Sequence, residues 1–170
     1  MDQKYVKFLL DSKRSIIEFE TIELSHPAFT QSYFIVRNHP SGLTLGVESL
    51  DGSFQQVEFQ YVPMTVTPTA FRNDLDFGLE ISFGDLGEIL QVEANRVLAS
   101  PENRVKPNLI YRGYRSDDLS APMNGPFELT INDITFNRDG ATFIADARRL
   151  NLTRIGEVYT TQRFKGLRGL

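Results

Sequence analysis

Apolar and polar residues alternate with a period of two along most of this chain, a pattern typical of β-strands that bury one face. The alternation is clearest in Leu43–Val47, Val57–Tyr61, Leu79–Phe83 and Phe127–Ile131. Tyr33–Arg37 is a short apolar run that predicts a buried strand. These segments together predict a protein built mainly from β-strands.

One predicted strand changes its pattern part-way along. Ile17 and Phe19 share one parity, whereas Ile22 and Leu24 take the other. A shift of one residue moves side chains to the opposite face of a sheet, and an inserted residue produces such a shift. The sequence therefore predicts a β-bulge near Thr21.

Two turn signals connect predicted strands. Asp51-Gly52 lies between Leu43–Val47 and Val57–Tyr61, and a strand, Asp-Gly and strand in succession is a strong signal for a β-hairpin. Asn137–Gly140 is a second turn that leads into the predicted strand Ala141–Ala147.

The segment Asp85–Ala99 breaks the β pattern and predicts an amphipathic helix packed on the sheet. Asp85 followed by Glu88 is a helix-start signal, and Pro101 closes the far end. Glu93 is expected to be exposed. The apolar residues at helical spacing are Leu86, Ile89, Leu90, Ala94, Val97 and Leu98.

These elements predict a mainly β fold: a β-sandwich or split β-barrel with one flanking amphipathic helix and an extended C-terminal arm. We expect residues 1–153 to form a single domain and residues 154–170 to form the arm. The 170 residues include no cysteine, so disulfides and thiolate metal sites are excluded. The sequence shows neither a secretory pattern nor a membrane-spanning run, so no membrane contact is expected.

The C-terminal segment carries the opposite charge to the rest of the chain. Residues 148–170 contain six basic residues and one acid, hence +5, and the net charge of −4 leaves −9 for residues 1–147. This segment also carries apolar residues, among them Tyr159, Phe164 and Leu167. A basic arm on an acidic body predicts contact with another copy or a partner subunit. The alternative is that the arm folds back as a last strand on its own domain.

Candidate chemistry is sparse. His26-Pro27 and His39-Pro40 place both histidines before proline, which favours extended or turn positions. We interpret His26 and Pro27 as a structural turn rather than as part of a metal site. Residues 73–80 contain carboxylates, but the glycine spacing departs from that of a calcium loop. We therefore expect no catalytic, cofactor-binding or metal-binding residues, and no cofactor.

Several segments, in this order, resemble a domain-of-unknown-function family of tail proteins in long-tailed bacteriophages and prophages. The most distinctive is Glu23–Phe29, with the pattern Glu-x-Ser-His-Pro-x-Phe. The segments that carry the resemblance are Ile17–Phe29, Tyr33–Asn38, the hairpin around Asp51-Gly52, Leu75–Leu90, Leu109–Asp118 and the C-terminal Tyr159–Leu170. The family commonly ends in an aromatic residue followed by Pro-Gly-Leu, whereas Lys165 stands here between Phe164 and Gly166-Leu167.

The resemblance implies a non-enzymatic structural subunit of the tail tip, with a β-sandwich or split barrel and one flanking helix. Its partners would be further copies in a homo-oligomeric ring and the tail tube, hub and tape-measure proteins. It would be assembled in the host bacterial cytoplasm and reside in the virion, meeting nucleic acid only as the genome passes through the tail lumen. The arm residues expected to make contacts are Tyr159, Arg163, Phe164, Lys165, Gly166, Leu167 and Arg168.

Two other functions stay open. The first is a receptor- or carbohydrate-binding β-sandwich at a tail tip, with Tyr111, Tyr114, Asp117 and Asp118 as candidate ligand contacts. The second is an enzyme that degrades the cell wall, because paired carboxylates converge in space rather than in sequence.

Overall fold

The computed structural model describes residues 6, 10, 16–48, 52–69, 78–84, 87–137 and 140–147. Strands dominate these residues, so the predicted mainly β fold is confirmed. The strands are β1 (Glu18–Ser25), β2 (Tyr33–Val36), β3 (Leu43–Glu48), β4 (Phe54–Tyr61), β5 (Met64–Pro68), β6 (Gly78–Phe83), β7 (Asn108–Arg115), β8 (Asn124–Asn137) and β9 (Gly140–Asp146), and helix α2 spans Gly87–Ala99.

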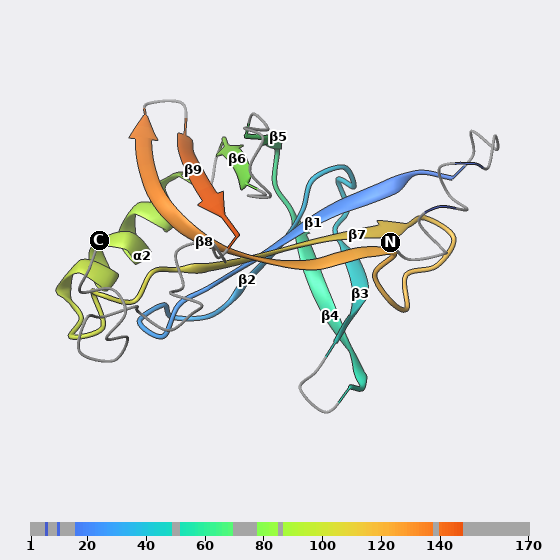
Figure 1. Cartoon of the computed structure of the whole chain (residues 1–170), viewed down its shortest axis with the longest axis horizontal. Helices are drawn as coiled ribbons and strands as arrows, with labels where there is room; N and C mark the ends of the chain where they lie inside the picture. Colours follow the sequence, from blue (N-terminus) through green and yellow to red (C-terminus); the bar gives the residue numbers. More distant parts are fainter. Residues whose placement is uncertain are drawn as a thin grey trace, which may run out of the picture.

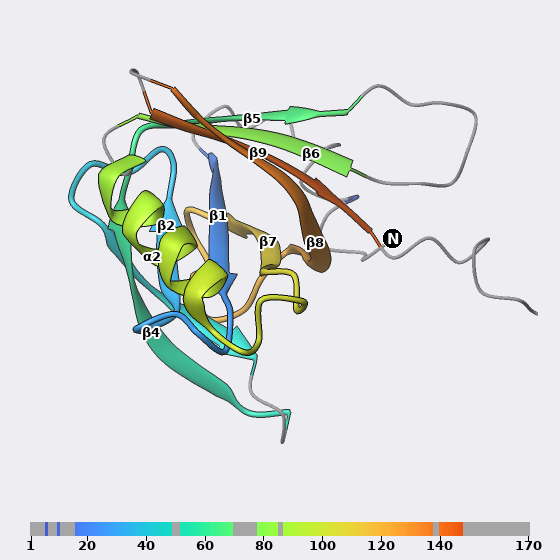
Figure 2. The same cartoon turned by 90° about the vertical axis from the view of Figure 1, so that its left-hand side faces the viewer.

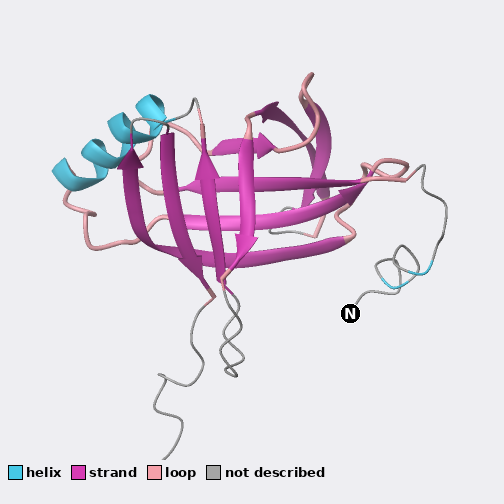
Figure 3. Cartoon of the chain, turned by 90° about the horizontal axis from the view of Figure 1, so that it is seen from above, coloured by secondary structure: helices cyan, strands magenta, loops and turns pink. Residues whose placement is uncertain are grey.

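The strands form one open sheet in the order β3-β4-β2-β1-β7-β8-β9-β6-β5. Neighbouring strands are antiparallel except for β2 and β4, which are parallel. The sheet folds over itself, so that β5, β6, β9 and part of β8 form one layer above β1, β2 and β7 (Figures 2 and 3). The arrangement resembles a sandwich made from one continuous sheet, with β3 and β5 as its edges.

The main hydrophobic core lies between these two layers. β1 and β2 contribute Ile22, Leu24 and Ile35, while β6 and β9 contribute side chains such as Ile81 and Phe143. Helix α2 lies at one end of this core and adds Leu90 (Figure 2).

A second core lies on the opposite face of β1, β2 and β7. It joins Phe19, Val36 and Tyr114 to Leu45 of β3 and Phe59 of β4. The Tyr114 hydroxyl donates to the Gly46 carbonyl oxygen at 2.9 Å, which ties β3 to the central sheet. β3 and β4 project away from the rest of the molecule beyond this core (Figure 1).

The two cores explain the change of parity in β1. Its pairing with β7 is continuous from Glu18 to Ser25, so the predicted β-bulge near Thr21 is wrong. Successive side chains of a strand point to opposite faces. Phe19 enters the second core and Ile22 enters the main core, so the buried parity changes without an inserted residue.

Bulges occur instead in β8, the longest strand. The register between β8 and β7 shifts between Tyr111 and Gly113 of β7. The register between β8 and β9 shifts between Ile131 and Asp133 of β8. A bulge bends a strand and increases its twist. The two irregularities allow β8 to pair with β7 in the lower layer and with β9 in the upper one.

The predicted hairpin between β3 and β4 is confirmed by antiparallel pairing from Leu43 with Phe59 to Glu48 with Phe54. Gly52, in the turn, has a φ of 79°, a conformation that favours glycine. The second predicted turn also joins paired strands, since Asn137 of β8 lies opposite Gly140 of β9.

The predicted helix exists, but the residues expected to face the sheet are partly wrong. Leu90 and Val97 are buried, whereas Ile89 is 51% and Leu98 72% exposed. Glu93, expected on the exposed side, is only 4% exposed. The helix buries a narrow stripe at spacings of three and four residues, and Ile89 and Leu98 lie outside that stripe.

Leu90 and Ile89 provide a matched test of helix packing. Replacing Leu90 with Ala should lower the free energy of unfolding by about 2–5 kcal/mol, because the truncation leaves a cavity in the main core. Replacing Ile89 with Ala should change it by less than about 0.5 kcal/mol, because Ile89 is exposed. Urea unfolding of both variants measures the difference. Equal effects would contradict the packing described here.

Candidate assembly surfaces

An open groove lies where the two layers of the sheet approach each other. β4 ends at Tyr61 and β5 begins at Met64, so the chain crosses from one layer to the other in two residues. The Gly84 amide donates to the Pro63 carbonyl oxygen at 3.3 Å, which fixes this crossing to the end of β6. The groove has a volume of about 470 Å³ and is lined by Arg37, Asn38, Tyr61, Pro63, Met64, Thr65, Ser82, Phe83 and Gly84.

Arg37, the charged side chain among the residues that line this groove, is paired. The Arg37 guanidinium forms an ion pair with Glu20, whose other carboxylate oxygen accepts from the Tyr111 hydroxyl at 3.2 Å. Glu18, two residues before Glu20, has its pKa raised, first by burial and further by the Glu20 charge, against a hydrogen bond from Asn124. The groove therefore combines a neutralised ion pair with both polar and apolar lining residues.

Helix α2 is fastened to the loop after β1 by Glu93. Its carboxylate accepts from the Thr30 amide at 3.1 Å, from the Thr30 hydroxyl at 2.6 Å and from the Tyr33 hydroxyl at 3.0 Å. Arg96 adds an ion pair at 3.2 Å. Burial raises the pKa of Glu93, but the hydrogen bonds from Thr30 and Tyr33 and the Arg96 charge outweigh it. The net pKa therefore lies below the ordinary value of 4.5.

The outward side of α2 is partly apolar. Ile89 and Val92, three residues apart on one side of the helix, are 51% and 59% exposed, and Leu98 is 72% exposed. On the projecting β3–β4 hairpin, Phe54 is 47% exposed. Contiguous exposed apolar patches mark surfaces that contact another protein, and the neighbouring pair Ile89 and Val92 is the candidate for such a contact on α2.

The predicted structural turn lies directly after β1. The Ala28 amide donates to Nδ1 of His26 at 3.0 Å, so the ring proton lies on Nε2, which donates to the Val105 carbonyl oxygen at 3.0 Å. The Phe29 amide also donates to the His26 carbonyl oxygen at 3.0 Å. His26 thus joins the turn containing Pro27 to the loop before β7. This geometry suits a structural turn, and that role stays a prediction.

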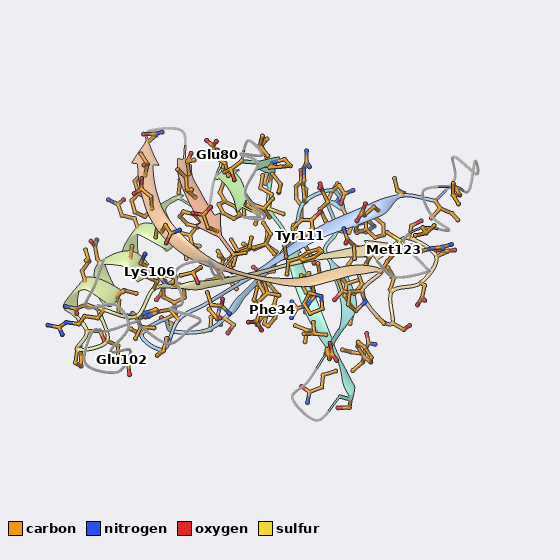
Figure 4. The ribbon with its side chains drawn as sticks, in the orientation of Figure 1. Phe34, Glu80, Glu102, Lys106, Tyr111 and Met123 are labelled. Carbon is orange, nitrogen blue, oxygen red and sulfur yellow. The ribbon has the colours of Figure 1, made fainter. Side chains whose placement is uncertain are left out.

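The four residues considered for ligand binding do not form an exposed aromatic platform. Tyr114 is fully buried, and burial raises its pKa to about 12. Tyr111 is 9% exposed, lies in the middle of the sheet and stacks on Phe127 with ring centroids 6.4 Å apart (Figure 4). Asp117 accepts two hydrogen bonds from Arg115, which lower its pKa, and Asp118 accepts from Ser120.

The arm residues Tyr159, Arg163, Phe164, Lys165, Gly166, Leu167 and Arg168 lie outside the described residues. Residues 73–76, considered for a calcium loop, lie outside them as well. Among the residues that are described, no group of three or more acidic or histidine side chains is arranged to hold a metal ion. The described part of the chain also contains no helix that is both long and apolar enough to span a membrane.

The family model DUF1833, described as a domain of unknown function, matches residues 7–152. The chain belongs to the DUF1833 family. The resemblance to a domain-of-unknown-function family is thus confirmed at that level, and the link to phage tails stays a prediction. No curated protein and no solved structure matches the chain.

Sequence reasoning missed Glu93, which this DUF1833 member uses to connect α2 with the loop after β1. Replacing Glu93 with Gln should lower the free energy of unfolding by about 1–3 kcal/mol at pH 7, because a neutral amide is a weaker acceptor for these donors. The folded-state pKa is depressed, so the carboxylate stabilises the fold above the unfolded value near 4.5 and loses this effect as pH falls through the folded value. The difference between wild type and variant should therefore shrink in acid.

Thermal unfolding between pH 7 and pH 3 measures this difference. The control is Glu102 replaced with Gln, since Glu102 is exposed in the loop after α2 (Figure 4). A Glu93 variant as stable as the Glu102 variant at pH 7 would contradict the role assigned to Glu93.

Proposed function

We propose that this protein is a structural subunit of a bacteriophage tail tip, a distal or minor tail protein without enzymatic activity. It assembles with further copies in a ring and with the tail tube, hub and tape-measure proteins. It is made in the host cytoplasm and becomes part of the virion. The sequence resemblance, which runs through most of the chain, supplies the tail-specific part of this proposal.

The observation that carries the assembly part is the exposure of large apolar side chains on separate surfaces of an open sheet. Phe54 lies on the projecting hairpin, and Ile89 and Val92 lie on the outward side of α2. β3 and β5 end the strand order, and sheet edges offer backbone groups for pairing with another chain. A subunit that contacts different neighbours through different surfaces needs this distribution.

The tyrosines considered for a receptor- or carbohydrate-binding module are used for packing instead. Such modules offer aromatic faces to sugars, and neither Tyr111 nor Tyr114 has a ring exposed for that purpose. The assembly proposal is therefore the one that the described side chains support best.

The hairpin offers a direct test. Replacing Phe54 with Asp should weaken ring formation or co-assembly with tail proteins, because it places a charge in an apolar contact, and should leave the melting temperature within about 2 °C of wild type. Gln56 is exposed on the same face of β4, so Gln56 replaced with Asp is the matched control and should assemble normally.

Negative-stain imaging and sedimentation of the purified proteins, alone and with tail tube and hub proteins, provide the measurement. Rings or stable co-complexes that depend on Phe54 would support the proposal. A wild-type protein that stays monomeric with every tail protein and binds a glycan array would favour the receptor-binding alternative.

A further inference from the structure

The layer formed by β5, β6, β9 and β8 has one side that no described element covers. In Figure 2 these strands form the upper layer of the molecule, and β1, β2 and β7 lie below it. From Leu79 to Phe83 and from Ala141 to Asp146, residues alternate between buried and at least partly exposed positions. Ile81 and Phe143 point into the main core, while their neighbours Glu80 and Thr142 point away from it. We call the uncovered side the outer face.

Two cross-strand rows define the outer face. The register of the paired strands brings the members of each row side by side. The first row consists of Thr65, Ser82, Thr142 and Thr135, and the second consists of Thr67, Glu80, Ile144 and Asp133.

The outer face is acidic and partly apolar. Glu80 and Asp133 lie on either side of Ile144, which is 37% exposed. Neither carboxylate forms an ion pair with a described residue, and neither row contains a base. Asp146, in the next position of β9 on the same side, accepts a hydrogen bond from Asn132 at 2.8 Å. Thr67 beyond Glu80 and the threonines of the first row add methyl groups beside these charges.

The C-terminal arm has the complementary chemistry. Residues 158–170 contain Arg163, Lys165 and Arg168 and no acidic residue. Between and beside these bases stand Tyr159, Phe164 and Leu167, which need an apolar surface that a segment of this length cannot form by itself. A face that presents an isoleucine between two carboxylates, neither of them ion-paired with a described residue, satisfies both requirements.

We propose that the outer face binds residues 158–170 of a second copy of this chain. The inference rests on the proposed assembly function and names the surface through which copies join. Because the arm and the outer face are different parts of the chain, each copy gives its arm to one neighbour and receives an arm from another. Such head-to-tail contacts close into a ring when the rotation between copies permits.

Charge reversal tests the contact from both sides. Glu80→Lys combined with Asp133→Lys should weaken self-association of the intact chain by at least about tenfold, since like charges then face each other. Arg163→Glu combined with Lys165→Glu should have the same effect. A chain that carries all four substitutions restores opposite charges and should recover most of the association. Sedimentation velocity measures the association, and raising the salt should weaken the wild-type contact through screening over ~8 Å.

The matched control reverses two exposed carboxylates elsewhere, with Glu58→Lys on β4 and Glu102→Lys after α2. This variant has the same net charge as the outer-face variant and should associate like wild type. An equal loss in the control, or no recovery in the fourfold variant, would overturn the proposal, because the effect would then depend on net charge or on another surface.

Engineered cysteines decide which copy supplies the arm. The chain has no cysteine, so Thr142→Cys and Gln162→Cys introduce the sole thiols. Disulfide-linked dimers in a mixture of the two single variants, absent from either variant alone, support binding of a second copy. A disulfide that forms only within one chain of the double variant shows that the arm lies on its own body. That outcome, or no disulfide in either sample, overturns the proposal.

Imaging of the same samples separates this inference from the proposed function. Rings that persist in the outer-face variant support a tail-ring function and overturn the outer face as the site of the arm. A wild-type protein that never associates with itself or with tail proteins overturns both. Rings lost in the outer-face variant and recovered in the fourfold variant support both.

Discussion

The structure depends on three central strands, β1, β2 and β7, that bury one face along part of their length and the other face along the rest. Phe19, Val36 and Tyr114 lie on one side, whereas Ile22 and Ile35 lie on the other. A strand with apolar residues on a single side can support one core only. By changing the buried parity, each central strand supports two, and the sheet gains a layer on both of its faces.

The point where the parity changes is polar and contains an ion pair, while the buried Arg112 Nε has no hydrogen-bond partner among the described residues. The Thr21 hydroxyl donates to the Arg112 carbonyl oxygen at 3.0 Å, and the Arg112 guanidinium donates to Glu23 at 2.8 Å. Arg112 is 4% exposed, so this ion pair is largely removed from water and would be costly without a partner for each charge. The pair joins the side chains of β7 and β1 on the face of these strands that also carries Phe19 and Tyr114.

Local signals in the sequence were sufficient for the strands and hairpins but not for the choice of buried face. Alternation and Asp51-Gly52 predicted the β3–β4 hairpin because both depend on adjacent residues. The parity change in β1 predicts a bulge that the structure lacks, because a period-two pattern cannot show that two cores exist. Glu93 was expected in water because its partners, Thr30 and Tyr33, lie 63 and 60 residues away in the sequence. The register of β6 and β8 against β9 likewise places Glu80 and Asp133 on either side of Ile144. No local sequence motif predicts that these two residues lie close together.

The same open sheet that accommodates two cores also places the residues that stabilise the fold and the residues exposed to neighbouring molecules on different surfaces. The concave side of the β5–β6–β9–β8 layer is filled by the main core, and Glu93 fastens α2 at one end of it. The exposed residues of the outer face, the hairpin and the outward side of α2 contribute little to folding, since their side chains pack on no described core. Substitutions there can alter association while leaving the free energy of unfolding nearly unchanged. The proposed ring assembly would benefit from this separation, because substitutions on a contact surface could then change association without unfolding the subunit.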